Sequence, residues 1–180
     1  MDNKSIYKYA AESGLPAGLY LTLMSIGVMM SHKVELLDWV VPLLLVGFPF
    51  FMAWRMKRMV RIKPEYGNFS PLWLFGIYTI IFGTLICMLA TYLYLLYVDP
   101  HFIKESLNHA VETFSKLPDE GVSSMSEVMR QAAEKNVYPT KTQFVTSMGW
   151  FTCFSGSMLS FVLASVISWR RRRRRVSMFR

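Results

Sequence analysis

Four stretches of this chain, 13–31, 39–54, 71–98 and 144–169, carry no charged side chain and are long enough, or nearly long enough, to cross a lipid bilayer as helices. A helix rises about 1.5 Å per residue and the hydrocarbon core is about 30 Å thick, so about 20 residues suffice. The stretches are continuous, unlike the alternating segments of about ten residues in membrane β-barrels, and a helix pairs its backbone groups internally. We therefore predict an all-α, polytopic membrane protein with four transmembrane helices, at about 13–31, 37–54, 71–98 and 144–169.

The composition agrees with a membrane chain of one domain. Hydrophobic residues make up 53% of the 180 residues and charged residues 18%, below the level of about 25% in soluble domains. We treat 1–180 as a single membrane domain. Lys4 and Lys8 precede the first stretch as in a secretion signal, but no A-x-A-like cleavage site follows, which indicates an uncleaved signal anchor.

Three prolines fall within the first two predicted spans. Pro16 is expected in the first turn of its helix, where a missing N–H group is tolerated. Pro42 and Pro49 lie inside the second span, where each removes a backbone donor. We therefore expect a kink near Gly47–Pro49.

Lysine and arginine are distributed unevenly between the two predicted sides of the membrane. Two precede the first span, five follow the second and seven lie in the tail, 170–180, whereas the opposite side has six. That opposite side also holds nine of the twelve acidic residues. The positive-inside rule therefore predicts that both termini are cytoplasmic. The arginines 170–175 follow Trp169 directly and are interpreted as a stop-transfer anchor on anionic head groups, not as a nucleic-acid-binding arm.

Residues 99–143 form a predicted outer excursion between the third and fourth spans. Apolar residues recur there at helical spacing, which predicts an amphipathic helical hairpin on or above the outer leaflet. Asp99 and Pro100 are expected to be the N-cap and the first residue of the first helix. Ser124 and Glu127 are expected to form a capping box at the start of the second.

Two histidines and two carboxylates share one face of the first helix of this excursion, namely His101, Glu105, His109 and Glu112. Such a set could ligate zinc, but the compact zinc signatures are absent. We favour an ordinary polar face on an amphipathic helix, with metal binding as the alternative. No cofactor is expected.

Small residues recur at spacings of three and four along the third and fourth predicted spans. Because lipid offers no hydrophobic drive between helices, such stripes mark close helix contacts. The stripes are Gly76, Thr79, Gly83, Cys87 and Ala90 in the third span and Gly149, Cys153, Gly156, Ser160 and Ala164 in the fourth. We expect them to pack on each other or on another subunit, with the Cα atoms of the two cysteines within about 10 Å.

Recognisable chemistry is absent from the sequence. No Asp, Glu, Lys, Arg or His lies in the middle of a predicted span, which argues against an ion-coupled transporter. No nucleotide, phosphate-loop or hydrolase motif occurs, and we expect no enzymatic activity.

The basic segment after the second span is the best candidate for an interaction surface. The simpler interpretation, which we favour, is a solvated loop that sets topology. The functional interpretation is a dock for a lipid phosphate or a cytoplasmic enzyme. The candidate contacts with head groups or a partner are Arg55, Lys57, Arg58, Arg61, Lys63, Arg170, Arg171 and Arg172.

Three short motifs connect these features to a known family. They are "ESGLPAGLYL" (12–21), "EYGNFS" (65–70) and "YLYLLYVDPHFI" (92–103). The chain resembles the small four-helix bacterial membrane proteins called domain of unknown function 4199, which have a tyrosine–glycine–glycine turn and an aromatic–aspartate–proline–phenylalanine exit. Asn68 stands where a second glycine is common. The resemblance implies an inner-membrane location in Gram-negative bacteria and assigns no catalytic residue.

Two functional hypotheses follow for a protein of this kind. The favoured one is a non-enzymatic scaffold or complex subunit that contacts membrane lipids and either self-associates or binds another membrane or membrane-associated protein. The alternative is a membrane anchor or lipid-presenting partner of a polyprenyl-phosphate glycosyltransferase, since the resemblance implies that such enzymes are encoded near family members. An enzyme or carrier in its own right is the least favoured hypothesis.

Overall fold

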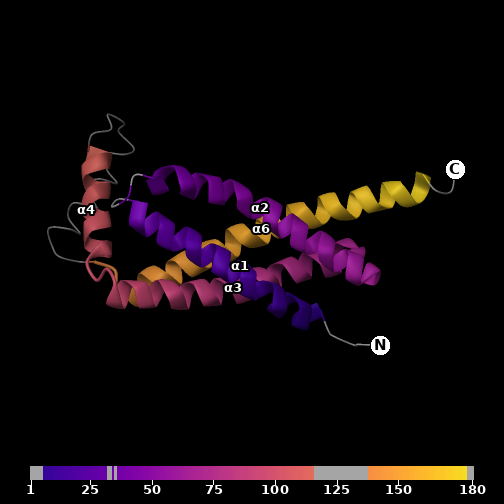
Figure 1. The fold of residues 1–180 in the computed structure, drawn as a ribbon, viewed down its shortest axis with the longest axis horizontal. Coiled ribbons are helices and arrows are strands. Elements are labelled where there is room, and N and C mark those ends of the chain that lie inside the picture. Colours follow the sequence, from indigo (N-terminus) through magenta and orange to yellow (C-terminus); the bar gives the residue numbers. More distant parts are fainter. Residues whose placement is uncertain (1–5, 32–33, 35, 116–137, 178–180) are drawn as a thin grey trace. The chain divides into compact units, whose positions relative to one another are not determined.

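The protein is all-helical over the residues that its structure describes, as predicted. The structure is a computed structural model that describes residues 6–31, 34, 36–115 and 138–177, and no strand occurs among them. The elements are α1 (Ile6–Ser31), α2 (Leu36–Ile62), the 3-10 helix η1 (Pro64–Gly67), α3 (Phe69–Tyr97), α4 (Phe102–Ser115) and α6 (Lys141–Ser177). Helices α1, α2, α3 and α6 are each long and apolar enough to cross a membrane. Figure 1 shows their arrangement.

The chain divides into two compact units. Residues 1–91 and 148–180 form the first unit, which we call the bundle, and residues 92–147 form the second. Helices α3 and α6 each run from one unit into the other.

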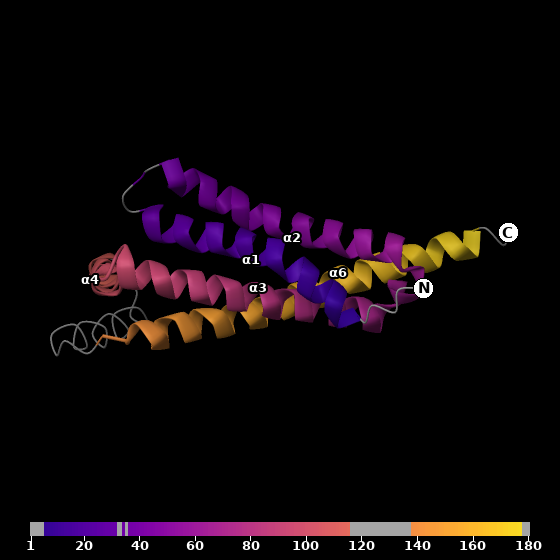
Figure 2. The same ribbon diagram turned by 60° about the horizontal axis from the view of Figure 1, so that its bottom comes forward.

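Within the bundle, the contacts show whether neighbouring helices run parallel or antiparallel to each other. Gly14 and Gly18 of α1 oppose Phe82 and Ile86 of α3, so these two helices run parallel. Helix α2 returns antiparallel to α1. Helix α6 runs antiparallel to α3, because its glycines meet earlier α3 residues as the chain advances. The described ends of α1 and α6 that are nearest the chain termini therefore lie at one end of the bundle, as Figures 1 and 2 show.

Helices α1 and α3 meet through a glycine contact that the predicted stripes of the third and fourth spans did not include. A Cβ atom on Gly14 would lie 2.5 Å from Cβ of Phe82, and one on Gly18 would lie 3.0 Å from the carbonyl oxygen of Gly83. From the other side, a Cβ atom on Gly83 would lie 3.1 Å from the backbone nitrogen of Gly18. The motif GLPAG at 14–18 has the spacing of the small-residue dimer motif of membrane helices, and this signal could have been found in the sequence.

Helix α2 is held to α1 by a tyrosine. The Tyr20 hydroxyl donates a hydrogen bond of 2.7 Å to the carbonyl of Leu44. Its ring stacks on Phe51 with centroids 5.4 Å apart. A Cβ atom on Gly47 would lie 2.6 Å from the Tyr20 hydroxyl oxygen, so only glycine leaves room for this bond.

The expected position of Pro16 in a first helical turn is wrong. Helix α1 begins at Ile6, so Pro16 lies inside it. A proline deprives the carbonyl four residues earlier of its helical partner, and here that carbonyl belongs to Glu12. The Arg55 guanidinium of α2 donates to this oxygen at 3.4 Å. A neighbouring helix thus compensates for the missing donor, as is usual in membrane proteins.

Helix α2 is also continuous although it contains two prolines. Pro42 and Pro49 both lie inside it, as predicted. The kink near Gly47–Pro49 stays a prediction.

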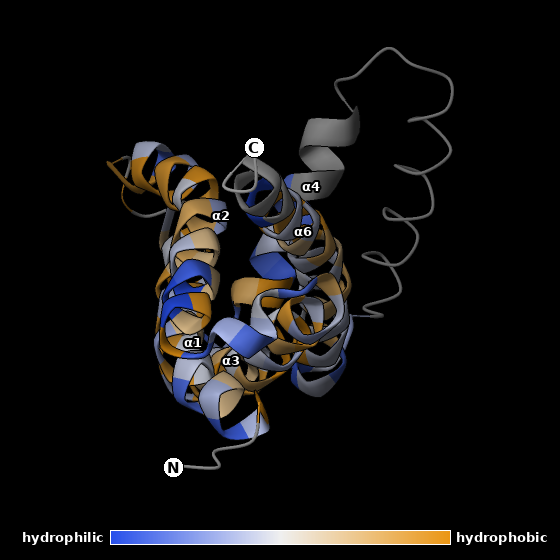
Figure 3. Cartoon of the chain, turned by 90° about the vertical axis from the view of Figure 1, so that its right-hand side faces the viewer, coloured by the Kyte–Doolittle hydropathy of each residue, from blue (hydrophilic) through white to orange (hydrophobic). Residues whose placement is uncertain are grey.

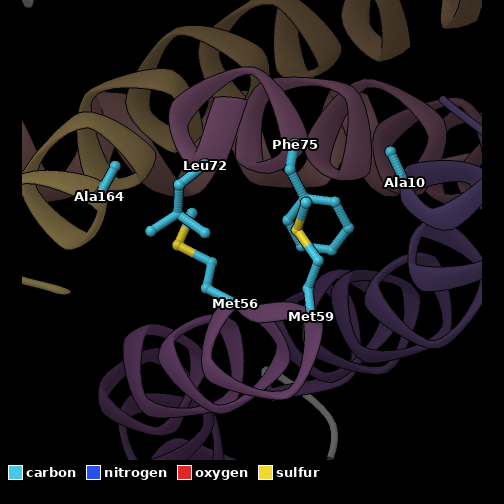
Figure 4. Packing of buried hydrophobic residues seen from close by; sticks show 6 residues of the cluster. All are labelled: Ala10, Met56, Met59, Leu72, Phe75 and Ala164. Carbon is cyan, nitrogen blue, oxygen red and sulfur yellow. The ribbon is translucent and has the colours of Figure 1, made fainter. Parts of the chain in front are cut away.

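All four long helices contribute to the hydrophobic cluster at the end of the bundle where α1 begins and α2 ends. Its buried members are Ala10, Met56, Met59, Leu72, Phe75 and Ala164. In Figure 4 the two methionines of α2 point toward the leucine and phenylalanine of α3, and the alanines lie on α1 and α6. Unbranched methionines suit this position because they fill irregular gaps between helices.

The bundle has two central and two peripheral helices. In the apolar stretches of α1 and α3, 44% of the residues are buried, against 11% in α2 and 17% in α6. Trp39 is 84% and Trp150 is 75% exposed within the chain. Figure 3 shows hydrophobic residues over most of the visible turns of α2. The peripheral helices therefore leave broad apolar surfaces for lipid or another chain.

The second unit contains α4 and the beginning of α6. Helix α4 begins at Phe102, so the expectation of Asp99 as N-cap and Pro100 as first helical residue is wrong. Asp99 is buried three residues earlier, and its carbonyl accepts a bond of 3.4 Å from the Phe102 N–H. The predicted second arm of the hairpin, with Ser124 and Glu127, lies outside the described residues.

Helix α6 begins with a reciprocal capping box. The Gln143 N–H donates to the Thr140 hydroxyl at 3.2 Å, and the Thr140 N–H donates to the Gln143 side-chain oxygen at 2.9 Å. This pairing satisfies two backbone donors and sets the first residue of the helix. The fourth long helix therefore begins three residues before the predicted span at 144.

Candidate functional site

Helix α2 continues through the basic segment that we expected to be a loop. That expectation is wrong for residues 55–62, which are helical. The helix ends only before Pro64, because a residue that precedes proline is disfavoured in the α conformation. Lys63 accordingly has φ −129° and ψ 84°. The predicted turn before the third span is η1, Pro64–Gly67.

Helix α6 likewise continues past its apolar stretch into the arginine run, ending at Ser177. Arginine is a good helix former, so the end of the hydrophobic run does not end the helix. The side chains of Arg170 and Arg171 are described, and that of Arg172 lies outside the described residues. Two helical basic segments, 55–61 on α2 and 170–171 on α6, thus lie at the same end of the bundle.

These segments share a groove of about 610 Å³ between α2 and α6. Its apolar lining residues are Pro49, Phe50, Ala53, Val60, Leu163, Val166 and Ile167. Its polar lining residues are all cationic, namely Lys57, Arg61, Arg170 and Arg171. Among the described residues, no carboxylate lines the groove. The chemistry of this lining matches an amphiphile that has an apolar chain and an anionic head group.

The cationic end of the groove is fixed by contacts between Arg171 and the turn η1. Arg171 Nη1 donates a hydrogen bond of 2.6 Å to the carbonyl oxygen of Pro64. The same guanidinium lies over Gly67, where an added Cβ atom would overlap its Nη1. Because this guanidinium is the end of a flexible side chain, a side chain at position 67 would displace it from the turn. This bond uses one of the five N–H donors of the guanidinium, so the group has the capacity to bind an anion as well.

A second hollow lies on the outer face of α2, next to the groove. It measures about 300 Å³ and is lined by Trp54, Lys57, Arg58 and Arg61. These residues are three and four apart and therefore share one helix face. The Arg58 guanidinium lies 5.7 Å from the centre of the Trp54 ring, in cation–π contact. Lys57 and Arg61 line both the hollow and the groove.

The other basic candidates, Arg55 of α2 and Lys63 directly after this helix, line neither of these two cavities. Arg55 lines a separate cavity of about 260 Å³, together with Glu12 and Arg58, and lines neither the groove nor the outer hollow. Lys63 lies 3.7 Å from the Glu65 carboxylate, which is a pair of modest strength. It too lines neither cationic cavity.

The predicted small-residue stripes meet at some positions and separate at others. A Cβ atom on Gly76 would lie 2.7 Å from Cβ of Ser160, and one on Gly156 would lie 2.7 Å from the Ile80 side chain, so both lie at the α3–α6 contact. Gly149 faces Met88 of α3. These three glycines and Ser160 therefore lie where α3 and α6 meet.

Gly83 and Cys87 belong to a different contact. Gly83 faces Gly18 and Ala17 of α1, not α6. The Cys87 thiol lies 3.9 Å from the Thr91 hydroxyl, which pairs at 3.1 Å with Ser25 of α1. Cys153 is partly exposed. The predicted separation of the two cysteine Cα atoms stays a prediction.

The histidine face of α4 shows no metal-binding geometry in the described part of the chain. His101, Glu105 and His109 are all exposed, and Glu112 lies outside the described side chains. Among the described residues, no group of three or more His, Cys, Asp or Glu side chains could hold a metal ion.

Comparison with known proteins identifies one family. The family described as "Protein of unknown function (DUF4199)" matches residues 12–169. No curated protein and no solved structure matches this chain.

Proposed function

Because this chain belongs to the DUF4199 family of proteins of unknown function, we propose a function from its own geometry: a non-enzymatic membrane protein that holds an anionic lipid. The observation that carries this proposal is the groove between α2 and α6, whose described lining combines seven apolar residues with four cations and no carboxylate. The lipid's chain would lie against the apolar part and its phosphate among the cations.

The balance of charges supports an anionic occupant over a neutral one. Lys57 and Arg61 are four residues apart on one helix, and adjacent like charges destabilise a helix by about 0.2–0.5 kcal/mol per pair. Arg170 and Arg171 add two more positive charges to the same groove. A phosphate would relieve this repulsion and form charge-assisted hydrogen bonds with the guanidinium groups.

The proposal includes a location and a topology. We place the protein in the bacterial inner membrane with both termini cytoplasmic, as the positive-inside rule predicts. The groove would then face the cytoplasmic leaflet, where anionic lipids attract basic segments by about 1 kcal/mol per Lys or Arg.

The exposed apolar surfaces of α2 and α6 support a role as a complex subunit. Within the chain these helices bury few of their apolar residues, so they are available to a second copy or another membrane protein. The alternative is that the protein presents a polyprenyl phosphate to a glycosyltransferase, a lipid whose single chain and phosphate also match the groove. Purification from native membranes separates the two: a self-oligomer supports the first and a co-purifying glycosyltransferase the second.

Lipid binding itself is tested with delipidated protein in a neutral detergent. We expect phosphatidylglycerol, but not phosphatidylcholine, to raise the thermal stability. A ligand at a hundred times its Kd stabilises a protein by about 2.7 kcal/mol. The double variant Arg61→Gln with Arg170→Gln should lose this effect. Lys63→Gln, which removes one charge from the same basic segment outside the groove, is the matched control.

Two results would contradict the proposal. Equal stabilisation by phosphatidylglycerol and phosphatidylcholine would mean that the cations do not select a head group. Retention of the full effect in the double variant would mean that the anion binds outside the groove.

A further inference from the structure

We propose that the ligand of this basic end is a lipid with two separate phosphate groups, one in the α2–α6 groove and one in the outer hollow of α2. This inference rests on the proposed function and extends it, because it specifies the head group. It follows from the way in which two cationic cavities share a wall.

The shared wall consists of Lys57 and Arg61, which line both cavities. Each cavity also has cations of its own: Arg170 and Arg171 in the groove, and Arg58 in the outer hollow. The two cavities are therefore lined by five cations in all, three from α2 and two from α6. Among the described residues, no carboxylate lines either cavity. A single phosphodiester carries one negative charge and would leave most of this positive charge uncompensated.

The outer hollow has the features of a head-group site at the membrane interface. Tryptophan is enriched where a membrane helix leaves the hydrocarbon, because its ring is apolar and its N–H is polar. Trp54 is the last residue of the predicted second span, and Arg58 lies over its ring. The cation–π contact holds this guanidinium on the outer face of α2, away from the groove.

The arrangement favours two phosphates that are separated by a linker over a diphosphate. A diphosphate has adjacent phosphorus atoms and would be held by one cavity. The cations that line only one of the two cavities come from different helices: Arg170 and Arg171 of α6 line the groove, and Arg58 of α2 lines the hollow. Cardiolipin has two phosphodiesters joined by a glycerol, and basic pockets between membrane helices bind such head groups.

The test measures the affinity of the full-length protein for three lipids: phosphatidylglycerol, cardiolipin and a polyprenyl diphosphate. Concentrations are expressed per phosphate, so that the second phosphate of cardiolipin does not raise its apparent affinity merely by doubling the number of phosphates. We expect cardiolipin to bind about tenfold more tightly than phosphatidylglycerol, since one additional cation-stabilised phosphate contributes about 1 kcal/mol or slightly more.

The decisive variant is Arg58→Gln. It removes the one cation that lines the outer hollow but not the groove. The preference for cardiolipin should be lost, while the affinity for phosphatidylglycerol should not change. Arg58 also lines the small cavity beside Glu12. The matched control is Arg55→Gln, because Arg55 lines that cavity and lies over the Trp54 ring but lines neither the groove nor the outer hollow. Lys63→Gln controls for the loss of one charge.

The possible failures are distinguishable. If phosphatidylglycerol and cardiolipin bind equally, or if the polyprenyl diphosphate binds more tightly than cardiolipin, the two-phosphate arrangement is overturned while lipid binding stands. If none of the three binds more tightly than phosphatidylcholine, the proposed function itself is overturned. Loss of the cardiolipin preference in Arg55→Gln as well would also contradict the assignment to the outer hollow.

Discussion

The contact between α1 and α3 makes a quantitative prediction about Gly18. Its replacement by alanine places a Cβ atom 2.8 Å from Cβ of Ile86 and 3.0 Å from the carbonyl oxygen of Gly83. Neither neighbour is the flexible end of a side chain. The helices must therefore separate.

The size of the effect follows from ordinary contact distances. Carbon atoms pack at about 3.5–4.0 Å, so the helices must move apart by up to about 1 Å. A gap of that size forfeits about a quarter to a half of the dispersion energy of each contact. Summed along the interface, this matches the cost of about 1–3 kcal/mol that is typical for overpacking.

Gly27→Ala is the matched control on the same helix. A Cβ atom there meets only a methyl group of the Val41 side chain, at 3.1 Å. Alanine is favoured over glycine in helices by about 1 kcal/mol, which offsets a small displacement of that methyl. We therefore expect Gly27→Ala to unfold close to the wild type.

The assay is equilibrium unfolding in mixed micelles with an increasing mole fraction of SDS, followed by circular dichroism. Gly18→Ala should unfold at a lower SDS fraction than the wild type, and Gly14→Ala should behave similarly because its Cβ atom would lie 2.5 Å from Cβ of Phe82. If Gly18→Ala and Gly27→Ala unfold at the same SDS fraction, close backbone approach is not what holds α1 against α3.

Three further predictions concern the α1–α2 contact and the topology. Tyr20→Phe removes the bond to the Leu44 carbonyl and should lower the free energy of unfolding by about 0.5–1.5 kcal/mol in the same titration; an unchanged midpoint would refute this. Arg55→Ala should destabilise less in a Pro16→Ala background, because the restored N–H supplies the Glu12 carbonyl with a helical donor. Equal costs in both backgrounds would show that the two residues are not coupled. Tags at the N- and C-terminal ends should both resist protease in right-side-out vesicles. Digestion of one tag alone would contradict an even number of crossings, and digestion of both would contradict cytoplasmic termini.

Much of the fold could be predicted from the apolar runs. A charge-free run of about 20 residues has one favourable structure in lipid, a helix, since every backbone group must be paired. The third span, predicted at 71–98, accordingly corresponds to α3, Phe69–Tyr97. The ends of the second and fourth helices were harder to predict. Helix α2 continues through basic residues to Ile62, and α6 continues into the basic tail as far as Ser177. The basic residues mark the end of each apolar run, not the end of the helix.

The candidate site could be predicted in part. The sequence identified the basic residues of 55–63 and 170–172 as possible lipid contacts. It could not show that 55–62 is helical, and only that helicity divides Lys57, Arg58 and Arg61 between a groove and an outer face. It also could not show that Arg171 lies over Gly67, because 104 residues separate the two in the chain.

The number of apolar helices, the small-residue stripes and the clusters of positive charge can all be read from the amino-acid order, since each of these is a property of one segment alone. The tertiary structure decided which stripes meet. Gly76 faces α6 whereas Gly83, seven residues later on the same helix, faces α1. A stripe of small residues shows that another helix can pack closely against that face. Which helix does so depends on how all four helices pack together.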